Sequence, residues 1–151
     1  MKRTAFFALV LLGTALLLAS GGAPALGKDI LLQGMLHNKF NVLDGDKDEI
    51  IATIETKGKK VTNFTWDPKD LDKIYCITDW GQQIEQLDLA AKKSVRTFRL
   101  GGDGVKVRAL DIEVNPANPK LLYALSLRQR WLSDEILDMT PAVLVIDLAT
   151  E

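Results

Sequence analysis

The sequence predicts an all-β fold made of a repeated antiparallel sheet, and two pairs of matching segments support this prediction. The segment NFTWDPKDLDKIY, residues 63–75, returns 48 residues later as DIEVNPANPKLLY, residues 111–123. VLDGDKDEIIATI, residues 42–54, matches QLDLAAKKSVRTF, residues 86–98, at an offset of 44. Apolar runs on both sides of an Asp/Asn-Pro turn are typical of paired strands. A period of about 20–50 residues indicates a repeat architecture.

Alternation of apolar and polar residues predicts three units of strands. The first unit lacks its first strand and the third lacks its last, so the units contain three, four and three strands: 30–36, 39–44 and 49–55; 61–66, 73–78, 83–88 and 94–100; 107–114, 121–127 and 142–148. His37-Asn38 is the predicted turn within the first unit. Gly101, Gly102 and Gly104 are expected to supply positive φ in the connector that leads to the third unit.

Four-stranded antiparallel sheets repeated radially are the blades of a β-propeller. The sequence therefore predicts part of a β-propeller, about two and a half blades, over residues 26–151. A closed ring needs about 4–8 blades. We interpret the chain as the N-terminal part of a longer protein, because an open blade would leave backbone groups unpaired. Assembly with other chains is the alternative.

Residues 1–25 have the pattern of a secretory signal peptide. Lys2 and Arg3 precede an apolar run over residues 5–19, and Ala23-Pro24-Ala25 offers small residues at a cleavage site. An uncleaved membrane anchor is the alternative, but the run is shorter than the ~20 residues that a bilayer span needs. We expect a periplasmic or secreted protein with no stable membrane span after cleavage.

Composition limits the function classes. The formal net charge of −1 gives no electrostatic reason to expect nucleic acid as a partner. The single cysteine, Cys76, cannot form an internal disulfide, and its place on a strand predicts a small buried hydrophobe. A reactive or intermolecular thiol is the alternative.

The repeats resemble a known family. The stretches NPANPKLLYAL, AVLVIDLATE and WDPKDLDKIYCI resemble the YVTN-type propeller repeats of exported bacterial proteins, although IYCITD and LYALSL stand where the YVTN tetrapeptide would be. NVLDGDKDEIIATI and the long hairpin insertion before TPAVLVIDLAT are similar to the β chain of quinohemoprotein amine dehydrogenase.

This resemblance implies a propeller subunit of a periplasmic amine-oxidising complex, without catalytic residues of its own in this part of the chain. It also implies that the redox cofactors belong to partner chains, with heme on one and a cysteine-tryptophan-derived quinone on another. A chain with one His and one Cys has no CxxCH motif for a c-type heme, so we expect no cofactor here.

The insertion at residues 128–140, RQRWLSDEILDMT, is the candidate partner-binding segment. The Ile146-Asp147 pair follows Leu87-Asp88 by 59 residues instead of 48, which places 11 additional residues before the last strand. Arg128, Arg130 and Trp131 are of types enriched at interface hot spots. Helical spacing of apolar residues also allows a short amphipathic turn. A loop that packs on its own blade is the alternative.

Other candidate sites have simpler interpretations, and we predict no catalytic, cofactor or metal residue. Residues 44–48, DGDKD, with Glu55 imitate a calcium loop, but Glu49 stands where Gly is required, which favours a solvated turn. His37 has no nucleophile motif to serve. Trp66 and Trp80 are expected between blades or on a hairpin, with a cavity wall near the axis as the alternative. Asp67 and Asn115 are expected to form Asx turns.

Two functions from different classes remain open besides the amine dehydrogenase subunit. One is a stand-alone exported propeller that binds a protein or another ligand. The weaker one is an enzyme of lactonase type that uses acidic residues and a metal in the central channel.

Overall fold

The computed structural model describes residues 30–102, 104–132 and 135–150, and the side chains of residues 131–139 are not described. The predicted signal peptide, residues 1–25, lies outside this part. The described elements are all strands apart from one 3-10 turn, η1: β1 (Ile30–Gly34), β2 (Lys39–Asp44), β3 (Glu49–Glu55), β4 (Phe64–Asp67), β5 (Asp70–Thr78), η1 (Asp79–Gly81), β6 (Gln83–Asp88), β7 (Lys93–Arg99), β8 (Gly101–Gly102), β9 (Val105–Val114), β10 (Leu121–Leu132) and β11 (Glu135–Asp147).

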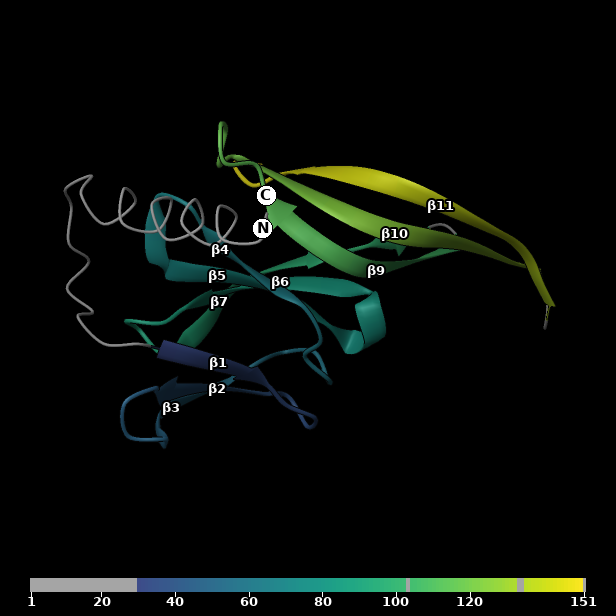
Figure 1. Cartoon of the computed structure of the whole chain (residues 1–151). Coiled ribbons are helices and arrows are strands. Elements are labelled where there is room, and N and C mark those ends of the chain that lie inside the picture. Colours follow the sequence, from purple (N-terminus) through teal and green to yellow (C-terminus); the bar gives the residue numbers. More distant parts are fainter. Residues whose placement is uncertain (1–29, 103, 133–134, 151) are drawn as a thin grey trace, which may run out of the picture.

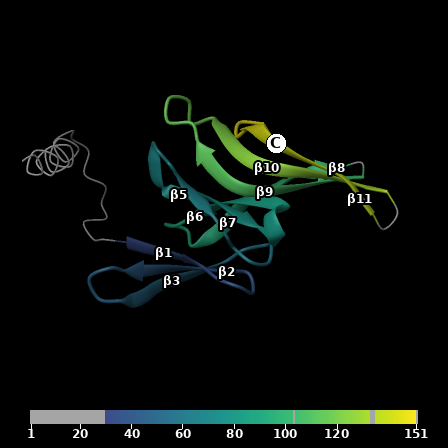
Figure 2. The same ribbon diagram turned by 45° about the vertical axis from the view of Figure 1, so that its right-hand side comes forward.

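The strands form three antiparallel sheets that lie face to face in chain order (Figures 1 and 2). The first sheet has the order β1-β2-β3, the second β4-β5-β6-β7 and the third β11-β10-β9-β8. The second sheet therefore has a neighbour on each face. Because side chains alternate along a strand, its two faces can both be apolar and support two separate cores.

The core between the first and second sheets contains Phe40 and Ile54 from the first and Ile74, Cys76 and Leu87 from the second. The rings of Phe40 and Phe64 meet edge to face, with centroids 5.6 Å apart and planes at 89°. That arrangement is preferred for aromatic pairs because the positive ring edge faces the negative ring face.

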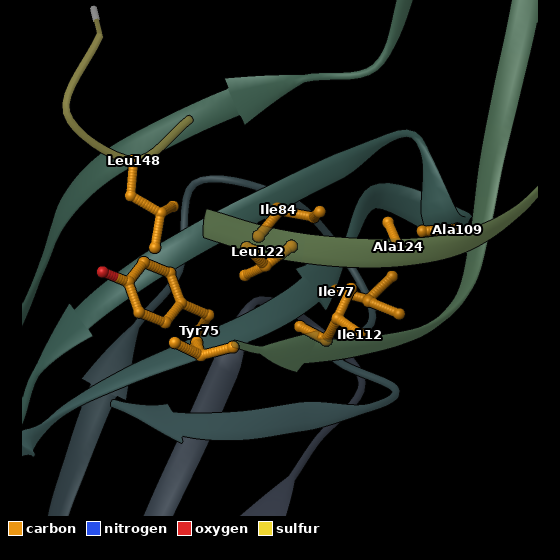
Figure 3. Close-up of a cluster of buried hydrophobic side chains, with 9 residues drawn as sticks. Tyr75, Ile77, Ile84, Ala109, Ile112, Leu122, Ala124 and Leu148 are labelled. Carbon is orange, nitrogen blue, oxygen red and sulfur yellow. The ribbon is translucent and has the colours of Figure 1, made fainter. Parts of the chain in front are cut away.

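The core between the second and third sheets is shown in Figure 3. Tyr75, Ile77 and Ile84 face Ile112 and Leu122 across it. At this interface Arg96 on β7 donates to the backbone carbonyls of Leu148 and Thr150, which follow β11.

The turns at one end of the sheets share one feature. In each, an Asp or Asn side chain accepts a hydrogen bond from a backbone N–H two or three residues later. Asp67 Oδ1 accepts from Lys69 N at 2.9 Å, and Asn115 Oδ1 accepts from Ala117 N at 2.9 Å, as the sequence predicted. The repeated Leu-Asp pair has the same role, since its aspartates accept from the backbone in the turns after β2, β6 and β11: Asp44, Asp88 and Asp147.

We call the opposite end, which holds residues 56–63, η1 and β8, the connector end. His37 and Asn38 form the predicted turn here, with φ of 64° and 55°. Gly101 and Gly104 have the predicted positive φ, 85° and 79°, but Gly102 does not.

The predicted strands are present, but the prediction of only three strands in the third unit was wrong. β8 adds a short strand beside β9, on the side away from β10, where the sequence suggested only a connector. The insertion does not form a helical turn, because β10 runs on to Leu132 and β11 begins at Glu135. Arg128 pairs with Thr140 across this extended hairpin. The hairpin projects beyond the other turns on the right-hand side of Figure 1.

The outer face of the third sheet is apolar and uncovered within the described residues. Leu125, Val143 and Val145 are 47%, 64% and 60% exposed. By the repeat, Leu125 matches Ile77 and Val143 matches Ile84, and both of those are fully buried. The third sheet thus presents the face that the second sheet buries.

This equivalence predicts that substitution by alanine has very different effects on stability at the two matching positions. Ile84→Ala should lower the free energy of unfolding by about 2–5 kcal/mol, because it leaves a cavity in a core. Val143→Ala at the matching position should change it by less than about 0.5 kcal/mol, because its side chain already contacts water. Urea denaturation of both variants measures the difference, and equal losses would contradict the assignment of the two faces.

Candidate interaction surfaces

Polar side chains connect β9 of the third sheet to β4 of the second and to Asn63, which precedes β4. Asn63 Nδ2 donates to the Leu110 carbonyl at 3.0 Å and to Asp111 Oδ1 at 3.1 Å. Thr65 Oγ1 donates to Glu113 Oε2 at 3.2 Å. Asn63 and Asp111, like Thr65 and Glu113, are 48 residues apart, so equivalent positions of successive repeats meet. β4 and β9 therefore lie side by side, as neighbouring strands around a common axis do.

Glu85 on β6 is a fully buried carboxylate with hydrogen bonds to both oxygens. Oε1 accepts from Gly58 N at 2.6 Å, Thr78 Oγ1 at 2.9 Å and Gln83 Nε2 at 2.8 Å. Oε2 accepts from Lys57 N at 2.8 Å and Ser94 Oγ at 2.7 Å. We call these groups the Glu85 network. It joins the connector between the first two sheets to three strands of the second.

Burial by itself raises the pKa of Glu85, because it disfavours the charged form. The donors from Lys57, Ser94, Gly58 and Thr78 act in the opposite direction and outweigh burial, so the pKa of Glu85 lies below its ordinary value. The carboxylate is therefore ionised at neutral pH and holds its donors in charge-assisted bonds.

Gly58 has little room for a side chain. A Cβ on this residue would lie 2.5 Å from Thr78 Oγ1 and 2.8 Å from Thr78 Cβ. Only glycine lets the connector backbone come close enough for Gly58 N to reach Glu85.

The predicted partner-binding residues lie on the extended β10–β11 hairpin. Arg128 and Arg130 are exposed on β10. Trp131 belongs to the same strand by its backbone, where the register shifts, and its side chain lies outside the described residues. The hairpin replaces the tight η1 turn that joins the matching strands of the second sheet.

The two described tryptophan side chains have different surroundings. Trp66 is half-buried and packs on the core between the first and second sheets, which confirms the prediction of packing between units. Trp80 lies in η1, at the end of the β5–β6 hairpin, and is 51% exposed.

Comparison with known proteins finds likeness in structure rather than in sequence. No protein-family model matches the chain, and no curated protein matches it. Among solved structures, the β-propeller domain of Cps50 (Swd1) from Myceliophteria thermophila is similar, with a TM-score of 0.54 and 15% sequence identity. The alignment covers 78% of this chain and 35% of that one, so the chain spans about a third of that structure. The described residues form a partial β-propeller.

The three sheets are thus propeller blades, and the fold class predicted from the repeat is confirmed. Blades of this kind bury their faces against the next blade, which explains the two separate cores. Among the described residues, no helix is long and apolar enough to cross a membrane.

The remaining sequence candidates occupy structural positions. Cys76 is fully buried between the first two blades, and desolvation raises the pKa of its thiol, as expected of a buried hydrophobe. Glu55 pairs with Lys39, at the far end of the β2–β3 hairpin from Asp44, so the calcium-loop alternative lacks its geometry. In the described part of the chain, no three His, Cys, Asp or Glu side chains are grouped to hold a metal ion.

Sequence reasoning missed Glu85, although a signal was present. Glu85 stands two residues before Leu87, on the same side of the strand, and Leu87 belongs to the repeated Leu-Asp pair. A charged residue in register with a core leucine has to find partners inside the protein.

Replacement of the carboxylate should loosen the connector. Glu85→Gln keeps the shape but leaves backbone N–H groups facing an amide, so we expect a loss of about 2–4 kcal/mol in the free energy of unfolding. Glu49→Gln, at an exposed position, is the matched control and should cost less than about 0.5 kcal/mol. A loss no larger than that of the control would contradict the role of the network.

Acid should remove the stabilisation that the ionised Glu85 carboxylate supplies. Because the pKa of Glu85 is lower in the folded state, its stabilisation is present above the unfolded value of about 4.3 and is lost as the pH falls through the folded value. Between pH 6 and pH 3, the unmodified chain should therefore lose more free energy of unfolding than Glu85→Gln does. Urea titrations at both pH values measure this, and parallel losses would contradict it.

Proposed function

We propose that the chain is the N-terminal part of a non-catalytic, protein-binding β-propeller, and that the β10–β11 hairpin contacts the partner. The hairpin supports this proposal because it extends beyond the sheet and bears Arg128 and Arg130 in exposed positions. Arg forms bidentate bonds to carboxylates and is enriched at interface hot spots. Long loops on a rigid scaffold are common places for binding residues.

The more specific proposal is a periplasmic subunit of a quinohemoprotein amine dehydrogenase-like complex. Its support is the sequence resemblance of residues 30–151, together with the signal-peptide pattern of residues 1–25. In this proposal the chain binds no cofactor itself. Heme and a tryptophan-derived quinone are held by partner chains, and the propeller docks the subunits that bear them.

A stand-alone exported propeller that binds a protein or ligand is the second candidate. It shares the fold and the hairpin but has no redox partner, so the absorbance of the purified assembly distinguishes the two.

The test is co-purification of the tagged, unmodified protein from its native host, followed by absorption spectra. The amine dehydrogenase proposal expects heme absorbance in the purified complex. Arg128→Ala combined with Arg130→Ala should reduce the bound heme by about tenfold or more, because hot-spot losses are about 2 kcal/mol or larger. Trp131→Ala should also weaken the assembly without unfolding the chain.

Lys92→Ala combined with Lys93→Ala is the matched control, since both lysines are exposed at the other end of the blades. It should leave the heme content unchanged. A purified chain without heme would overturn the amine dehydrogenase proposal, and a complex insensitive to the hairpin substitutions would overturn the role of the hairpin.

A further inference from the structure

A polar cavity of about 410 Å³ opens at the connector end of the second blade. The η1 turn forms one side, and the end of β7 with β8 and the start of β9 forms the other. This volume lies within the ~300–1,000 Å³ typical of ligand pockets. We call this space the Gln83 cavity. The charged and amide side chains that line it are Asp79, Gln82, Gln83, Arg99 and Lys106.

Gln83 is the most buried residue of the lining, with 8% of its surface exposed. Its Nε2 donates to Thr78 Oγ1 at 3.2 Å and to Glu85 Oε1 at 2.8 Å. The ionised Glu85 carboxylate can only accept, so it fixes the orientation of the amide, because an inverted amide would set oxygen against oxygen.

The amide oxygen of Gln83 is left for a ligand. Among the described residues no group donates to Oε1, and this atom is still reachable by solvent. Because Gln83 lines the cavity and both N–H groups of Nε2 are held by the Glu85 network, Oε1 is the polar atom that it offers there. An acceptor in such a buried residue needs a donor from water or from a ligand.

Three more polar side chains of the lining have no partner among the described residues. They are the Asp79 carboxylate, the Gln82 amide and the Arg99 guanidinium. Asp79 and Arg99 have opposite charges and line one cavity, yet they do not pair with each other. Lys106 already has an interaction partner and is not counted with them. The cavity therefore offers both donors and acceptors that the fold itself does not use.

Backbone hydrogen bonds hold the two sides of the cavity in place. Asp79 N donates to the Lys59 carbonyl at 2.6 Å, and Gln82 N donates to the Asp79 carbonyl at 3.2 Å. Leu100 N donates to the Gln82 carbonyl at 2.9 Å, which ties the η1 turn to the residue after β7. A site held in this way loses little conformational entropy when a ligand binds.

A neutral ligand with several hydroxyl groups matches this lining. Each hydroxyl group can donate one hydrogen bond and accept others, so one ring can donate to Gln83 Oε1 and Asp79 and accept from Arg99. An anion placed on Gln83 would lie close to the buried Glu85 carboxylate, and a cation would meet Arg99. Burial of an unpaired charge costs more free energy than burial of a hydrogen-bonded hydroxyl group.

We propose that the Gln83 cavity binds a pyranose sugar. One hydroxyl group donates to Gln83 Oε1, and neighbouring hydroxyl groups bond to the Asp79 carboxylate and the Arg99 guanidinium. Hydrogen bonds to ionised groups are stronger than those between neutral groups. Gly101 and Gly102 also line the cavity, and their lack of side chains lets a ring approach the β8 backbone. The site goes beyond the proposed protein-binding function and uses none of the hairpin residues.

The test is a titration of the nitrogen-15-labelled full chain with glucose, galactose, mannose and N-acetylglucosamine, each followed by two-dimensional NMR. At least one sugar should bind and should shift the side-chain NH₂ signals of Gln83 and the backbone amide signals of Gly101 and Gly102, which line the cavity. Asp79→Gly and Arg99→Met should each weaken binding by about tenfold, equal to about 1.4 kcal/mol, because each removes a charged hydrogen-bonding partner.

Asp48→Gly and Lys93→Met are the matched controls. Asp48 has a positive φ of 55°, like the 49° of Asp79, so glycine fits both positions. Lys93 is exposed on β7, at the opposite end of the strand from Arg99. Both controls should bind the sugar with unchanged affinity, and melting temperatures confirm that each variant is folded.

Three results would overturn the proposal: no binding of any of the four sugars, equal losses in the site and control variants, or tighter binding of the free amino acid serine, a zwitterion, than of every sugar. A complex that is insensitive to the hairpin substitutions would overturn only the proposed function. The two failures are therefore distinguishable.

Discussion

The buried carboxylate of Glu85 is the interaction on which the arrangement of the first two blades depends. Both oxygens are fully bonded, and two of the donors, Lys57 N and Gly58 N, come from the connector rather than from a strand. The same connector bonds to the first blade through Thr56 N and the Asn38 carbonyl. Burying an ionised carboxylate without these donors would carry a large free-energy penalty. The connector therefore has to stay in contact with Glu85 while the carboxylate is buried.

Burial of apolar side chains also determines how the blades stack, because each blade can bury its faces only against its neighbours. The second blade does so on both sides, through Cys76 and Leu87 on one face and Ile77 and Ile84 on the other. The third blade has the same pattern, yet Leu125 and Val143 are exposed. Within the described residues, this face has apolar side chains at the positions that the second blade buries against its neighbour. This pattern fits a propeller built by addition of equivalent sheets.

Much of this architecture could be predicted from the repeat, because alternation fixes which side chains face a core and Asx residues fix the turns. The extension of β10 and β11 could not, since the spacing of Leu132, Ile136 and Leu137 also fits a helix and only pairing across the hairpin decides. Glu85 was missed because its donors are mostly backbone and hydroxyl groups without a motif. The surroundings of Trp80 could not be predicted either, because only the fold brings Lys60 over its ring and Arg108 to its backbone carbonyl.

Hydrogen exchange at the Lys57 and Gly58 amides measures how firmly Glu85 holds the connector. These residues lie in a connector, where amides ordinarily exchange quickly, but both N–H groups point at a buried carboxylate. Both amides should exchange about as slowly as those of β5 and β6 at neutral pH, and Glu85→Gln should speed their exchange while β5 stays protected. Fast exchange of both amides in the unmodified protein would contradict this expectation.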